Sequence, residues 1–84
     1  MKWEEIHRQY PNRFVLLGDI VEEKISEFKS KIIGGTIIDV FDNGQDTRKA
    51  YREHSERGLD VIYSIPSTPQ EFIVENVPYK GRVQ

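Results

Sequence analysis

The sequence contains no cysteine. Disulfide bonds, zinc sites built from thiolates and cysteine nucleophiles are therefore excluded. A chain without cysteine also agrees with a reducing compartment, where disulfides are rare. We therefore expect a cytoplasmic protein.

Long hydrophobic runs are missing as well. The longest purely apolar stretch is Phe14–Leu17, whereas a helix that crosses a bilayer needs about 20 apolar residues. Residues 1–11 lack the apolar core of a secretory signal peptide. We expect no membrane partner.

Neither charge sign is in large excess. The 12 basic and 14 acidic residues are interspersed along the chain and give a formal net charge of -2. Binding to nucleic acid draws much of its affinity from a basic patch, so no nucleic-acid partner is expected. The chain also lacks a P-loop, a G-x-G-x-x-G turn and a G-x-S-x-G elbow, and no cofactor is assigned.

What is present is a short chain of 84 residues, of which 37% are hydrophobic and 31% charged. This length supports one domain with a thin core, so we do not expect a single copy to enclose a deep active site. We predict one domain over residues 1–77 and a loose C-terminal tail over residues 78–84.

The spacing of apolar residues predicts six elements. Trp3, Ile6 and Tyr10 recur at helical spacing, so residues 3–10 are predicted as a short amphipathic helix. A second helix is predicted at residues 45–57, ended by Gly58. Strands rich in β-branched and apolar residues are predicted at 14–21, 31–42, 59–65 and 71–77.

Residues 22–31 are compatible with two structures. Ile25, Phe28 and Ile32 are helically spaced among good helix formers, which allows a helix. Strand-like runs flank the stretch on both sides, which favours a hairpin around residues 26–30. A glycine pair at positions 34 and 35 predicts a bulge or sharp bend in the second strand.

These elements follow the order α-β-β-α-β-β. The right-handed crossover rule makes the second and third strands parallel if they share one sheet. We therefore predict an α+β two-layer sandwich, with a mixed sheet of about four strands and both helices on one face. Its other face would be only partly covered and would need a partner chain.

Three carboxylates, those of Asp39, Asp42 and Asp46, fall within eight residues around an Asn-Gly pair. A calcium loop that starts at Asp42 fails, because Gly44 offers no side-chain ligand and Thr47 stands where the loop needs glycine. Acid–base catalysis would need a desolvated cleft, which no pattern here predicts. We expect the loop to turn the chain, with Asp46 or Asp42 capping the second helix.

The two histidines, His7 and His54, lie on different predicted helices, and a metal would need a third ligand. No catalytic residue, cofactor-binding residue or metal ligand is therefore assigned. One alternative remains open, in which a small enzyme or ligand-binding protein forms a polar site between subunits from His54, Asp42 and Asp46.

The chain carries five short packing motifs: Trp3-Glu-Glu-Ile6, Tyr10-Pro11, Phe14-Val-Leu-Leu17, Ile38–Phe41 and Asp60–Tyr63. In this order they resemble the pattern of a family of small bacterial proteins of unknown function. The resemblance implies an α+β fold and a bacterial cytosolic origin, and it implies no activity. Phe14 stands where tryptophan is usual in the family, and the similarity covers most of residues 3–65.

The main functional hypothesis is a non-catalytic protein–protein interaction module. It would offer an exposed sheet face or an edge strand to a second copy or to an unknown protein partner. The surplus of Ile and Val over what two short helices can cover motivates this hypothesis. The predicted contact surface is Ile33, Ile37 and Phe41, or their alternate-face neighbours Ile32, Ile38 and Val40.

Overall fold

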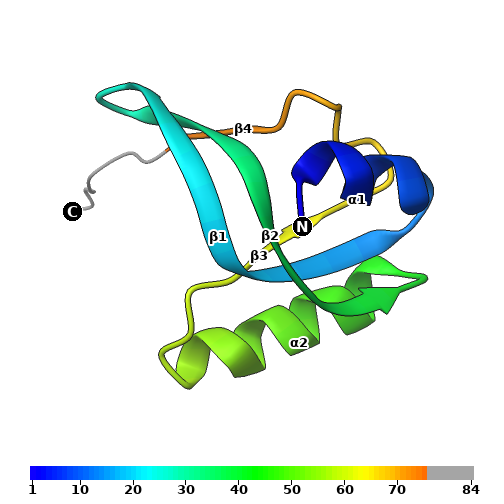
Figure 1. The fold of residues 1–84 in the computed structure, drawn as a ribbon. Helices are drawn as coiled ribbons and strands as arrows, with labels where there is room; N and C mark the ends of the chain where they lie inside the picture. Colours follow the sequence, from blue (N-terminus) through cyan, green and yellow to red (C-terminus); the bar gives the residue numbers. More distant parts are fainter. Residues whose placement is uncertain (76–84) are drawn as a thin grey trace.

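The structure, a computed structural model, describes residues 1–75, so the predicted tail lies outside the described residues (Figure 1). The order of its elements confirms the predicted α+β class and the succession α-β-β-α-β-β. Along the chain these elements are α1 (Trp3–Gln9), β1 (Phe14–Ser26), β2 (Lys29–Phe41), α2 (Gly44–Glu56), β3 (Ile62–Ser64) and β4 (Ile73–Glu75).

The four strands form one sheet in the order β3-β1-β2-β4. Every hydrogen-bonded pair in it is antiparallel, so the prediction of a mixed sheet was wrong. β2 and β3 do run in the same direction, because each is antiparallel to β1. They are not neighbours, because β3 pairs with the far edge of β1 after α2 has crossed the sheet.

β1 and β2 form one long hairpin of 13 residues on each strand. Ser26 pairs with Lys29, so the turn is made by Glu27 and Phe28. This geometry confirms the predicted hairpin and excludes the helical alternative for residues 22–31.

The predicted irregularity at the glycine pair is also confirmed. Gly18 pairs with Thr36 and Val21 pairs with Gly34, so Asp19 and Ile20 on β1 face the single residue Gly35 on β2. Asp19 takes a positive φ of 45°, a conformation that aspartate tolerates better than most residues. The long hairpin bends and twists at such bulges.

The two helices lie on opposite faces of the sheet, and the prediction that both share one face was wrong (Figure 1). Successive residues of a strand point to opposite faces. In β3, Ile62 packs against the core under α1, while Tyr63 meets the ring of Tyr51 on α2. The first four residues of β1, Phe14–Leu17, are all apolar and point alternately to the two faces of the sheet. Each face of the sheet therefore needs a helix to cover it at this place.

The main core lies between α1 and the sheet. Trp3 and Ile6 pack on Val15 and Leu17, and each of the four is buried. Trp3 also meets Phe72, with ring centroids 5.0 Å apart. Full burial of such side chains contributes about 2 kcal/mol each relative to exposure.

α2 begins directly after β2 and ends where the sequence predicts. Gly58 has a φ of 83°, which is the left-handed conformation that follows many helix ends. Thr47 is its one fully buried residue. α2 packs against β1, β2 and β3. Within residues 1–75, neither helix has the length and apolar character required to cross a membrane.

Candidate functional site

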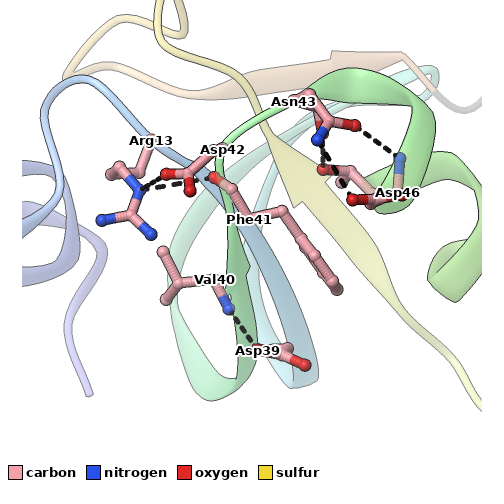
Figure 2. Close-up of polar contacts among 8 residues, drawn as sticks. Arg13, Asp39, Val40, Phe41, Asp42, Asn43 and Asp46 are labelled. Atoms are coloured by element: carbon pink, nitrogen blue, oxygen red, sulfur yellow. Dashed lines mark hydrogen bonds and ion pairs between the residues drawn. The ribbon is translucent and has the colours of Figure 1, made fainter.

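The acidic loop, residues 39–46, spans the end of β2 and the start of α2, and each of its carboxylates has a separate local partner (Figure 2). Asp39 Oδ1 accepts the N–H of Val40 at 2.8 Å. Asp42 forms an ion pair with Arg13, whose Nε lies 2.9 Å from Oδ1. The same Nε also donates to the carbonyl of Phe41 at 3.4 Å, which ties the loop to the start of β1.

Asn43 caps α2, and the predictions of Asp42 or Asp46 as the cap were wrong. Asn43 Oδ1 accepts the N–H of Asp46 at 2.8 Å, and Asn43 Nδ2 donates back to Asp46 Oδ2 at 3.1 Å. Figure 2 shows the two side chains facing each other in this reciprocal arrangement. Thr47 Oγ1 adds a bond to the Asn43 carbonyl at 2.7 Å. The loop thus turns the chain and starts the helix.

The remaining polar candidates do not converge within one chain. His54 Nδ1 donates to the carbonyl of Ala50 at 2.8 Å inside α2, and His7 packs beside Trp3 with ring centroids 5.6 Å apart. His54 lies eight positions after Asp46 in α2, which places the two residues roughly 12 Å apart along the helix axis. In the described part of the chain, no three His, Cys, Asp or Glu side chains gather where they could hold a metal ion. A site shared between subunits stays a prediction.

A group of exposed hydrophobic side chains lies on the far half of the hairpin, residues 21–33, which we call the hairpin arm. Figure 1 shows its tip extending away from both helices. Every residue from Val21 to Lys29 is exposed. Four large hydrophobic side chains on the arm are more than two-fifths exposed: Val21 (52%), Ile25 (53%), Phe28 (43%) and Ile33 (42%).

Bulges explain why some of these residues face solvent. At three places in the ladder between β1 and β2, a single residue has no partner on the opposite strand. A bulge re-aims its side chain and leaves its backbone outside the regular ladder. The three residues are Ile25, Ile33 and Ile38, and all are exposed.

The predicted contact residues therefore differ in their surroundings. Ile33 is exposed on the arm, whereas Ile37 is partly buried against the core and Phe41 is half-buried. Of the alternate set, Ile38 is exposed, Ile32 is fully buried, and Val40 packs against the core. Val21, Ile25 and Phe28 were not in either predicted set.

A cavity of about 530 Å³ adjoins the base of the arm. Trp3 and Ile32 are its buried lining residues, and Ile33 is its exposed hydrophobic one. Two lysines and two glutamates add charges of both signs to the lining. The other lining residues are Lys2, Glu4, Lys31, Gln70 and Glu71.

No protein-family model matches the chain, and no curated protein and no solved structure matches it.

Proposed function

We propose that this chain is a non-catalytic protein–protein interaction module that binds another protein chain through the hairpin arm. The observation that carries the proposal is the set of four exposed hydrophobic side chains, Val21, Ile25, Phe28 and Ile33, on an element that extends beyond both helices. Scattered single hydrophobic residues are ordinary on a surface, whereas a cluster on one element is typical of a contact site.

The exposed hydrophobic side chains of the arm supply only part of the free energy that a specific complex needs. Burying the exposed part of each of the four side chains contributes about 1 kcal/mol. Association itself costs several kcal/mol in lost freedom, so the side chains alone give a weak complex. Further contacts must come from the backbone of the arm or from the adjoining cavity.

The backbone of β1 offers such contacts. β3 pairs only with residues 15–17 of β1, so within the described residues no strand pairs with the outer edge of β1 beyond Leu17. An extended segment of a partner can add to such an edge through main-chain hydrogen bonds.

Two features restrict uncontrolled pairing along this edge. The bulges at Asp19–Ile20 and at Ile25 interrupt the edge, and Lys24 places a charge in its middle. Edge strands of natural proteins carry such interruptions and charges to prevent aggregation. The edge of the arm therefore accepts a short, matched partner strand and not an indefinite sheet.

The proposal is tested by photo-crosslinking in cells. A photoreactive phenylalanine analogue replaces Phe28 in one variant and Ile65 in a control variant, since Ile65 is exposed to a similar extent but lies outside the arm. We expect a discrete crosslinked protein, a second copy or another chain, from position 28 alone. Equal crosslinking at both positions, or none at position 28, contradicts the proposal. The expected setting is the bacterial cytosol, which rests on the sequence resemblance.

A further inference from the structure

A second surface lies at the other end of β1, between α2 and β3. It is a groove of about 430 Å³ with two arginines and two tyrosines in its lining. α2 packs against β3, so the helix forms one wall of the groove and the strand forms the other. The lining residues are Arg48, Tyr51, Arg52, Ser55, Glu56 and Tyr63.

β3 is the terminal strand of the sheet, and within residues 1–75 no strand pairs with its outer edge. The edge therefore offers main-chain donors and acceptors beside the groove. A groove between a free edge strand and a helix is a geometry in which an extended peptide can add to the sheet while its side chains meet the helix.

The charge in the groove is unbalanced. Arg48 and Arg52 lie one helical turn apart, and neither forms an ion pair with a described residue. Like charges at this spacing destabilise a helix by a few tenths of a kcal/mol, roughly. Glu56 also lines the groove one turn beyond Arg52, but no ion pair joins them. Two exposed guanidinium groups are thus free to meet anions.

The aromatic residues define the floor between helix and strand. The rings of Tyr51 and Tyr63 meet edge to face, with centroids 5.3 Å apart and planes inclined at 72°. Tyr51 keeps 36% of its surface exposed, so a ligand can contact its ring without any rearrangement of the core. Tyrosine and arginine are the residue types that most often carry binding energy at protein interfaces.

We propose that this groove binds an extended acidic segment of another protein, which adds to the free edge of β3 and places carboxylates against Arg48 and Arg52. The inference goes beyond the proposed function of the arm, because it concerns different residues and a partner of stated chemistry. The net charge of -2 makes the groove a local cationic site on a mildly acidic protein, which favours a peptide over a nucleic acid.

The test uses the full chain and a labelled synthetic peptide in which glutamate alternates with valine and threonine. Binding is measured by fluorescence anisotropy, and the contact surface is mapped by amide NMR shifts. We expect the largest shifts at residues 48–56 and 62–64. The double variant R48Q/R52Q should bind roughly fivefold to tenfold more weakly, because two exposed ion pairs are lost.

A matched control carries the same change of charge elsewhere. Arg8 and Lys49 are exposed cations that lie outside both the groove lining and the arm, and R8Q/K49Q should bind the acidic peptide as the wild type does. A peptide with glutamine in place of glutamate, and a peptide N-methylated at alternate amides, should both bind more weakly.

Several outcomes overturn the proposal. They are equal affinity for the glutamate and glutamine peptides, an equal loss in both double variants, shifts confined to the hairpin arm, and tighter binding of a single-stranded oligonucleotide than of the acidic peptide. None of these readouts uses a substitution in the arm. A negative result for the groove therefore does not bear on the function proposed for the arm, which the crosslinking experiment tests.

Discussion

Met1 and Gly35 exchange two main-chain hydrogen bonds, each 2.9 Å long, across 34 residues of sequence. The nitrogen of Met1 donates to the Gly35 carbonyl, and the Gly35 N–H donates to the Met1 carbonyl. Residues 1 and 2 thus cover part of the edge of β2 that does not pair with β1, next to the stretch of this edge that β4 covers. This contact places the first turn of α1 over the core.

Gly34 makes this close approach achievable. A Cβ at position 34 would lie 2.6 Å from the backbone oxygen of Met1, which cannot move without breaking the pairing. We expect Gly34→Ala to lower the free energy of unfolding by about 1–3 kcal/mol, as overpacking does. Urea unfolding measures the change.

Gly44→Ala is the matched control for that substitution. A Cβ there would lie 2.9 Å from the flexible end of Arg48, which a rotamer change can move away, and in ordinary contact with the Phe14 ring at 3.5 Å. We expect Gly44→Ala to be neutral or slightly stabilising, because alanine favours a helix. Equal loss from both variants would show that the contact of Met1 with β2 does not hold the fold.

Asn43 tests the role of the acidic loop. Asn43→Ala removes the acceptor for the N–H of Asp46, and we expect it to cost about 1 kcal/mol of stability. For a domain of this size that corresponds to a fall in Tm of about 4–8 °C. Asn43→Ser keeps a capping oxygen and should recover most of the loss. A Tm that does not change in Asn43→Ala would contradict the assignment of the cap.

Calcium should leave the loop unchanged. Asp39, Asp42 and Asp46 each serve a different local partner, and Glu53 lies exposed further along α2. Weak extracellular calcium modules saturate at about 1 mM or above, and we expect no change in the amide NMR shifts of residues 39–53 at that concentration. Saturable shifts in this range would show that the carboxylates rearrange around an ion.

The core under α1 should dominate stability. Ile6 is fully buried against Val15 and Leu17, so Ile6→Ala should cost about 2–5 kcal/mol. Ile65 is exposed, and Ile65→Ala should change stability by about 0.5 kcal/mol or less. Chemical unfolding of the two variants checks this contrast, and a similar cost for both would mean that α1 packs weakly.

Local pattern predicted the elements well, because their signals are local. The spacing of Trp3 and Ile6, the apolar run Phe14–Leu17 and the position of Gly58 each depend on a few neighbouring residues. The same apolar run contained the clue to the arrangement of the helices, since a strand that is apolar on both faces needs cover on both. The predicted two-layer sandwich placed both helices on one face and so left the other face of this run without cover.

The surface was harder to predict, because it depends on register. Ile33, Ile37 and Phe41 are four residues apart and share a face only in a strand without bulges. Bulges at Ile33 and Ile38 change that phase. Such bulges are set by pairing with β1, a contact between distant residues that side-chain type does not encode. Charged residues also alternate with Ile25 and Phe28 in residues 22–31, a pattern that does not indicate whether these two side chains are buried or exposed.

The predicted caps, Asp42 and Asp46, missed Asn43 for a related reason. Asp42, Asn43 and Asp46 are all good capping residues, and the choice depends on where β2 ends. The ladder holds Phe41 in the sheet, so Asn43 is the residue that precedes the helix.

The most direct test of the central claim is sedimentation velocity of the fluorescently labelled protein, in buffer and in an extract of its native host. The wild type should sediment in a species heavier than the 9.9 kDa monomer in at least one of these solutions. V21Q/I25Q, which removes two apolar side chains from the arm without changing charge, should lose at least one heavy species that the wild type forms, whereas the control L59Q/I65Q should behave as the wild type does. A wild type that stays monomeric in both solutions, or a V21Q/I25Q variant that retains every heavy species of the wild type, would contradict the claim.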